Sequence, residues 1–337
     1  MPRRPNGERR QVPDRAEAIG AKSPEGRSRP ANLGGTMARD TRRPGAALPW
    51  PLLTFAILVW SAGGANAQEP SAENRGEYVF HAGGCFACHT DVKQGGAPLA
   101  GGPPLKTPFG TFYAPNITPD PLYGIGRWSD ADFLRALREG KSPKGEHYYP
   151  VFPYTSYTKA SDRDLLDLKA YLFSRAAVAR PSRPHDVGFP FGWRFLLGFW
   201  KMLNFHQGRF RPDSERPAAW NRGAYLVEAL AHCGECHTPR NLLGGLDHAR
   251  WMAGSRDGAP GEVAPDITPH TPQGIGAWTQ NDVASLLRIG ITPDGSPITG
   301  AMRLVVEHST SKLTPADRMA IVAYLIALPP LPSAARK

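Results

Sequence analysis

The sequence predicts an all-α chain in which one small helical domain occurs twice in tandem, and three observations support this prediction. The chain aligns with itself at a fixed offset of 150 residues. Its only four cysteines fall into two copies of a C-x-x-C-H pattern. No segment shows the alternation of apolar and polar residues that is typical of half-buried strands. Together these features indicate an internal duplication of one all-α unit.

The repeat predicts the order of elements within each copy. Segments 114–119, 124–128 and 132–140 match segments 264–269, 274–278 and 282–290. Upstream, an Arg-Gly-x-Tyr motif at 75–78 and at 222–225 opens a helix that runs toward the cysteines. We expect a short helix at about 130–139 and another at about 280–289. A final helix then begins after Ser161 and after Thr314, because each hydroxyl is followed three positions later by an acid.

The two C-x-x-C-H motifs, at 85–89 and 233–237, predict covalent haem attachment. Two thiols three positions apart on one helical turn reach the two vinyl groups of one porphyrin, and the next residue places an imidazole under the iron. A zinc site needs its paired motifs about 15–20 residues apart, whereas these lie 148 apart. A disulfide does not require a histidine after each pair. The prediction is therefore two haem c groups, bound by these residues: Cys85, Cys88, Cys233 and Cys236 as thioethers, and His89 and His237 as axial ligands.

A methionine often completes the iron coordination on the other face of the haem. Met302 follows the short helix of the second copy, and we expect it on a loop from which it binds the second iron. Met252 is a weaker second candidate. Subtracting the repeat offset from Met302 gives Phe152, which cannot bind iron.

The sixth ligand of the first haem is therefore open to three interpretations. His147 lies five residues before Phe152 and is one candidate ligand. Met202 or another histidine from outside the first copy is a second. An iron with five protein ligands, free to bind water or a small molecule, is the third.

The charge distribution argues against a nucleic-acid partner. The formal charge is +10, but residues 1–67 hold 11 of the 40 Lys and Arg and 5 of the 30 Asp and Glu, which leaves 29 against 25. This segment is expected to be a disordered N-terminus followed by a signal peptide: a basic stretch, an apolar run at 52–60 and an Ala-x-Ala cleavage motif ending at Ala67. We expect translation to start at Met37 and the protein to be exported to the periplasm.

An aromatic segment at 189–205, inside a linker at 177–217, offers three interpretations. Placed on a helix, its apolar face carries Trp193, Trp200 and Leu203, while Arg194 and Lys201 form a narrow polar side. The segment could pack between the two copies, bind a redox partner, or make a peripheral contact with a membrane.

The chain resembles the multihaem cytochrome c subunits of membrane-bound alcohol, gluconate, fructose and aldehyde dehydrogenases. The resemblance rests on motifs at 100–103, 107–111, 116–119, 124–128, 154–157, 220–226 and 232–241. Trp128 and Trp278 occupy equal repeat positions and are candidates to pack on the porphyrin, although ordinary core tryptophans would show the same pattern. The resemblance adds Asn116 to the candidate cofactor-binding residues.

The internal repeat predicts two tandem cytochrome c-like haem domains, at 72–176 and 218–329. The resemblance implies that the protein transfers electrons from a dehydrogenase partner toward the respiratory chain, through an oxidase or a soluble cytochrome, without catalytic activity of its own. The alternative is a dihaem enzyme that acts on a peroxide or on a sulfur or nitrogen oxyanion at the first haem. Such subunits usually carry three haem domains, whereas this sequence ends soon after its second.

Overall fold

The protein is described from a computed structural model, which covers residues 69–259 and 261–335. These residues belong to one compact unit. The predicted signal peptide and the expected start at Met37 lie outside the described residues.

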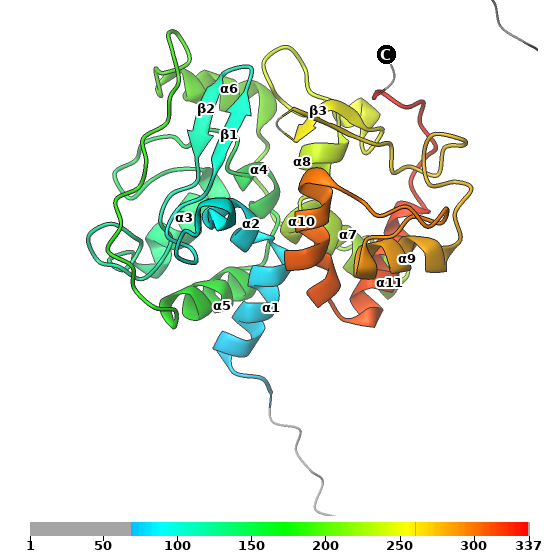
Figure 1. Cartoon of the computed structure of the whole chain (residues 1–337), viewed down its shortest axis with the longest axis horizontal. Coiled ribbons are helices and arrows are strands. Elements are labelled where there is room, and N and C mark those ends of the chain that lie inside the picture. Colours follow the sequence, from blue (N-terminus) through cyan, green and yellow to red (C-terminus); the bar gives the residue numbers. More distant parts are fainter. Residues whose placement is uncertain (1–68, 260, 336–337) are drawn as a thin grey trace, which may run out of the picture. The chain divides into compact units, whose positions relative to one another are not determined.

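The first lobe is built around the first C-x-x-C-H motif (Figure 1). Its elements are α1 (Ala72–Ala82), α2 (Cys85–His89), η1 (Val92–Gln94), β1 (Pro104–Thr107), β2 (Gly110–Tyr113), α3 (Asp130–Glu139), α4 (Tyr154–Tyr157) and α5 (Asp162–Phe173). Helix α6 (Leu196–Asn204) follows in the aromatic segment. It covers only part of the range that the sequence placed on a helix.

The second lobe shows the same order of elements around the second motif. They are α7 (Ala218–Tyr225), the π-helical turn η2 (Leu226–Leu230), α8 (Gly234–His237), η3 (His248–Arg250), β3 (Ser255–Ala259), β4 (Glu262–Ala264), α9 (Gln280–Ile289), α10 (Gly300–His308), η4 (Thr310–Lys312) and α11 (Pro315–Leu325). The position of the four-residue α4 in the first lobe is taken by the longer α10 in the second.

The helix starts predicted at Ser161 and Thr314 are confirmed, and the short helices expected at about 130–139 and 280–289 are present. Helices α3 and α9 start with complete capping boxes at Ser129 and Thr279 and end at glycines in the left-handed conformation. Helices α5 and α11 start at Ser161 and Thr314, whose side chains accept a hydrogen bond from the backbone NH three positions later. Local capping chemistry therefore decides where these four helices begin.

Two small antiparallel hairpins are the main departure from a purely helical chain. Strand β1 pairs with β2 from Pro104 opposite Tyr113 to Thr107 opposite Gly110, and β3 pairs with β4 across an irregular register. Each strand has only three to five residues. Runs this short cannot display a clear alternating pattern, so no strand was predicted there. The chain is helix-rich rather than all-α.

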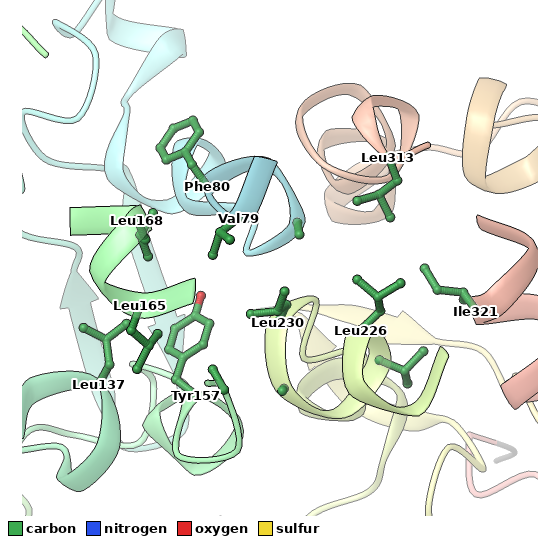
Figure 2. Packing of buried hydrophobic residues seen from close by; sticks show 14 of the residues in the cluster. Val79, Phe80, Leu137, Tyr157, Leu165, Leu168, Leu226, Leu230, Leu313 and Ile321 are labelled. Atoms are coloured by element: carbon green, nitrogen blue, oxygen red, sulfur yellow. The ribbon is translucent and has the colours of Figure 1, made fainter. Parts of the chain in front are cut away.

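The hydrophobic core forms where the first and last helices of each lobe cross. In the first lobe, Val79 and Phe80 of α1 meet Leu165 and Leu168 of α5, and in the second, Leu226 and Ile321 lie opposite one another (Figure 2). Gly76 makes the first crossing possible, because a Cβ there would lie 1.9 Å from the carbonyl oxygen of Asp167. Gly223 allows the second crossing for the same reason, because a Cβ there would lie 1.9 Å from the carbonyl oxygen of Ala320. Both glycines come from the repeated Arg-Gly-x-Tyr motif.

The two lobes are joined by reciprocal hydrogen bonds from their first helices. Tyr78 of α1 donates to Asp317 of α11, with 2.5 Å between the oxygens. Tyr225 of α7 donates to Asp164 of α5. Each tyrosine hydroxyl also accepts a hydrogen bond from the backbone NH at the start of the other lobe's final helix. Thus each lobe contributes to the helix start of its neighbour.

Candidate haem-attachment sites

The four cysteines lie on two short turns of helix, α2 and α8. All four are free thiols. Burial raises the pKa of Cys85 and of Cys233 to about 12, because a desolvated thiolate is unfavourable. Among the described residues there is no group of three or more His, Cys, Asp or Glu that could hold a metal ion.

Each motif ends in a histidine that is oriented by a proline carbonyl. Nδ1 of His89 lies 2.8 Å from the carbonyl oxygen of Pro115, and Nδ1 of His237 lies 2.8 Å from that of Pro265. With Nδ1–H donating to a carbonyl, Nε2 keeps its lone pair and is the nitrogen free to bind a metal. Burial lowers the pKa of both imidazoles, although the hydrogen bond to the carbonyl opposes this effect. A lowered pKa favours the neutral form that ligates iron.

These residues fit a covalently bound haem. Two thiols and an anchored imidazole come from one turn, and partly buried apolar side chains pack around that turn. In the first lobe the chain passes very close to this turn, because a Cβ on Gly102 would lie 1.6 Å from the carbonyl oxygen of Cys88. Only a residue without a side chain fits there.

Met302 and its repeat partner Phe152 occupy comparable positions in the two lobes. Met302 lies in the first turn of α10 rather than on the loop where the sequence placed it. Phe152 lies just before α4. Both side chains are partly buried and pack against the hydrophobic core. Phe152 is surrounded by aromatic rings, with its centroid 5.8 Å from that of Tyr148 and 5.9 Å from that of Tyr157.

His147 lies against α6. A Cβ added to Gly198 of that helix would come 3.6 Å from its Nε2, and the His147 carbonyl accepts a hydrogen bond of 3.0 Å from Arg194. Nδ1 is buried without a hydrogen-bond partner. The pKa of His147 is lowered, first by burial and then by the positive charges of Lys201 and Lys141.

The other methionines have different surroundings. Met252 is fully buried. Its NH donates to Oγ1 of Thr238, the residue after His237, at 3.1 Å, so its backbone is tied to the attachment turn. Met202 lies on α6 and is 75% exposed. Neither environment resembles that of Met302.

The remaining predicted site residues have clear packing roles. Trp128 and Trp278 are partly buried against the core, and each follows an identical turn in which its NH donates to an isoleucine carbonyl. Asn116 is buried. Its side-chain NH2 donates hydrogen bonds to the carbonyl oxygens of Val178 and Arg180, and its Oδ1 accepts one from the Thr118 hydroxyl. Asn116 therefore ties the segment after α5 to the loop that carries the Pro115 carbonyl.

The two attachment turns are linked by hydrogen bonds that converge on Gly83, two residues before Cys85. The carbonyl oxygen of Gly83 lies 3.1 Å from the Tyr157 hydroxyl and 3.2 Å from Nε2 of His232, which precedes Cys233. The rings of Tyr157 and His232 meet edge to face at 5.6 Å. Burial and then the Glu235 carboxylate raise the pKa of Cys236, and the charge of a Cys88 thiolate adds a smaller contribution in the same direction. These contacts bring the two turns close together.

Each attachment turn also packs against a helix of the other lobe, namely α10, which contains Met302, or α4, which follows Phe152. Phe86 of α2 lies against His308 of α10, with 4.6 Å between ring centroids. Glu235 of α8 accepts hydrogen bonds from Thr155 at 2.5 Å and Ser156 at 3.3 Å, both on α4. Arg240 balances the Glu235 charge at 2.8 Å.

Sequence reasoning missed the Pro115 and Pro265 carbonyls, Glu235 and the Tyr157–His232 contact. The two prolines belong to the repeated motif at 114–119 and 264–269, and the recurrence of that motif after each attachment motif was the available signal. Nothing in the sequence indicates that Glu235 reaches the other lobe.

A helical lobe built around a two-cysteine turn with a carbonyl-anchored histidine defines a c-type cytochrome. Comparison with known proteins agrees: residues 73–176 match the family model described as Cytochrome c. A protein named diheme cytochrome c-type from Cereibacter sphaeroides is 46% identical over 264 residues, covering 76% of this chain and 86% of that protein. The chain therefore belongs to the cytochrome c family, and its cofactor is haem c.

Two further relatives are subunits of dehydrogenases. The fructose dehydrogenase cytochrome subunit of Gluconobacter japonicus is 40% identical over 267 residues, which are 79% of this chain and 54% of that subunit. The gluconate 2-dehydrogenase cytochrome c subunit of Pantoea cypripedii is 38% identical over 290 residues, which are 82% and 64% of the respective chains. The chain thus spans less than two thirds of these two subunits.

Proposed function

We propose that this protein is a dihaem cytochrome c that transfers electrons from a dehydrogenase partner toward the respiratory chain. In this proposal one haem c is held by Cys85, Cys88 and His89, and the other by Cys233, Cys236 and His237. The two haem domains, at 72–176 and 218–329, are products of an internal duplication and are joined by the linker at 177–217. The names of the dehydrogenase-subunit relatives support this kind of partner.

The single observation that carries the proposal is the contact between the two attachment turns. His232, next to Cys233, and Tyr157 both bond the carbonyl of Gly83, close to Cys85. Haem c supplies reversible one-electron chemistry when bound. The chain's own residues keep the axial imidazoles neutral, orient them through Pro115 and Pro265, and hold the two turns at a fixed separation. Such an arrangement suits the passage of single electrons from one site to the other.

We further propose that this transfer takes place in the periplasm. Haem c attachment occurs outside the cytoplasm, and the segment at 37–67 has the basic, apolar and small-residue regions of a signal peptide. Met302 would be the sixth ligand at the second haem. At the first haem, three alternatives remain for the sixth position. It would be filled by His147, by a residue from outside the first lobe, or by no protein residue.

A second candidate function rests on Phe152. Its position in the first lobe matches that of Met302 in the second, and its side chain cannot ligate iron. A vacant sixth position would let a peroxide or a sulfur or nitrogen oxyanion reach the first iron. The second site would then deliver electrons to it. This would make the protein a dihaem enzyme.

Spectroscopy of the purified haem-loaded protein separates the two functions. We expect two haems per chain, and one in a Cys85→Ala/Cys88→Ala variant. If electron transfer is the whole function, both irons are low-spin in electron paramagnetic resonance and neither binds carbon monoxide after reduction. A high-spin iron that binds carbon monoxide, and that is lost in the Cys85→Ala/Cys88→Ala variant, would favour the enzyme. A single haem in the wild-type chain would contradict both.

A further inference from the structure

Helix α6 is oriented with its polar side toward the protein and its apolar side outward. Lys201 is only 9% exposed, and its ammonium group donates to the carbonyl oxygens of Glu139 and Gly140 at 2.5 and 2.8 Å. These carbonyls lie at the C-terminal end of α3, where a positive charge is favourable. Arg194 donates to the carbonyl of His147 and lies over the ring of Tyr149. Arg194 and Lys201 are the basic side chains of this segment, and both are bonded to the first lobe instead of facing water.

The outward side of α6 forms an exposed apolar surface together with one loop of the second lobe. We call it the aromatic ridge; its residues are 48% to 100% exposed and comprise Phe189, Phe191, Trp193, Phe195, Phe199, Met202, Leu203, Leu242 and Leu243. The loop is fixed to α6 by two hydrogen bonds. Nε1 of Trp200 donates to the carbonyl of Leu243 at 2.7 Å, and Asn241 donates to Asn204 at 2.8 Å. The ridge is therefore a single surface on a rigid support.

The chemistry of the ridge favours a lipid bilayer over a protein as its partner. Among its nine side chains, the only group able to form a hydrogen bond is the indole NH of Trp193, apart from weak methionine sulfur. A protein interface typically forms about one hydrogen bond per 100–200 Å² and needs such groups for specificity. Aromatic and leucine side chains are those that settle at the boundary between headgroups and acyl chains.

The charge distribution around the ridge also favours a lipid bilayer. No Asp or Glu occurs between Asp186 and Asp213, and the loop 241–246 has no charged residue. Two basic residues of this interval, Arg209 and Arg211, are exposed beyond the end of α6, although Arg209 is paired with Asp162 at 2.5 Å. Because the ridge itself carries no carboxylate, it can approach anionic headgroups without repulsion. Within the described part of the chain, no helix has both the length and the apolar character needed to cross a membrane.

We propose that the aromatic ridge inserts into the interfacial layer of a lipid bilayer and holds the cytochrome on the membrane surface. The contact goes beyond the proposed electron transfer and does not depend on the number of haems. The ridge side chains would leave water for the acyl boundary, while Arg194 and Lys201 stay bonded to the protein. The helix would lie parallel to the membrane plane, because its apolar residues follow one side along its length.

The test is co-sedimentation of the purified haem-loaded protein with phospholipid vesicles, comparing two double variants. Phe199→Ser/Leu203→Ser removes two ridge residues that are 60% and 66% exposed. Val92→Ser/Leu122→Ser is the matched control, because these residues are 60% and 68% exposed elsewhere on the surface. We expect the ridge variant to bind vesicles at least about ten-fold more weakly than wild type, and the control to bind as wild type does. Addition of phosphatidylglycerol to phosphatidylcholine vesicles should strengthen wild-type binding.

Four results would overturn the proposal. Equal binding by wild type and the ridge variant would assign membrane contact to another segment, and no binding by wild type would remove it. Sedimentation of wild type as a dimer that the ridge variant abolishes, without vesicles, would make the ridge an interface between two copies. If the ridge variant no longer bound a purified dehydrogenase but bound vesicles as wild type does, the ridge would be a protein-docking surface. Haem spectra of all variants should match wild type, so failure here is distinct from failure of the proposed function.

Discussion

The hydroxyl of Tyr78 lies 2.5 Å from Oδ2 of Asp317, a residue 239 positions later in the chain. Tyr78 belongs to the first helix of the first lobe, and Asp317 to the first turn of the last helix of the second. Tyr225 and Asp164 form the converse pair. Asp317 also accepts two hydrogen bonds from Arg222 of its own lobe. The two tyrosine pairs therefore connect the first helix of each lobe to the start of the last helix of the other.

Replacing Tyr78 by Phe should destabilise the whole unit. The change removes a hydrogen bond to a charged acceptor and leaves Asp317 with fewer donors, so we expect a loss of roughly 1.5–3 kcal/mol in the free energy of unfolding. Guanidinium titration followed by circular dichroism measures it. Tyr225→Phe should give a loss of similar size, whereas Tyr123→Phe, at an exposed position, is the control. If Tyr78→Phe costs no more than Tyr123→Phe, the bond across the lobes contributes nothing.

The stability that Asp317 supplies should disappear in acid. Burial raises its pKa, but hydrogen bonds from Arg222 and Tyr78 outweigh burial and hold the pKa below 3.8. A carboxylate with a depressed folded-state pKa contributes fully above the unfolded pKa, near 3.8, and loses that contribution as pH falls through the folded value. The difference in unfolding free energy between wild type and Asp317→Asn should therefore be constant from pH 7 to about 5 and shrink below about 4. A difference that stays constant down to pH 3 would contradict the assigned ionic role.

Gly76→Ala should damage the crossing of α1 and α5. The new methyl group would lie 1.9 Å from the carbonyl oxygen of Asp167, so the helices must separate. We expect a loss of about 3 kcal/mol or more in unfolding free energy, at or above the usual range for overpacking. Gly188→Ala is the matched control, since a Cβ there meets nothing within 4 Å. Equal stability of the two variants would show that the helices do not approach so closely.

Lys201 should make the protein more stable as pH rises from about 8 toward 10. Burial lowers the pKa of Lys201 to about 8, against 10.5 in its ordinary state. Between these values the unfolded chain binds more protons than the folded one, so stability increases with pH. Lys201→Met should lack this increase. The comparison of wild type with Lys201→Met at each pH removes the contribution of tyrosines, and an identical pH dependence in both would refute the prediction.

Glu235→Gln should raise the reduction potential of the haem proposed at Cys233 and Cys236. The carboxylate lies within the second attachment turn, where its negative charge favours the ferric state. Spectroelectrochemistry should show one potential shifted upward by tens of millivolts and the other changed less. Thr155→Val removes one hydrogen bond to Glu235 without removing its charge, and should shift the potential less. Equal shifts at both haems would indicate a general rearrangement instead.

The sequence predicted the parts of the fold that local chemistry determines. Ser129, Thr279, Ser161 and Thr314 mark helix starts because a capping hydroxyl and an acid three positions later satisfy the same backbone groups. The C-x-x-C-H motifs and the histidine positions follow from the reach of one helical turn. These features need no knowledge of what lies across the molecule, and the structure confirms the predicted helices.

Features that depend on tertiary contacts were not predictable. The hairpins are too short to show a period, and Met302 lies on a helix because α10 packs beside α2, which its own sequence does not reveal. The orientation of α6 is the clearest case. Its sequence left open whether the apolar side packs between the two copies or faces a redox partner or a membrane. The carbonyls at the end of α3 attract Lys201, and so the aromatic side faces out.

The reciprocal tyrosine pairs have a consequence for how the molecule comes apart. Because the start of each lobe's last helix is completed by a hydroxyl of the other lobe, melting one lobe withdraws a partner from its neighbour. Loss of structure in one half is thereby transmitted to the other, and the two should melt in a single cooperative transition. The two attachment turns held this way keep their relative position until the entire unit is lost.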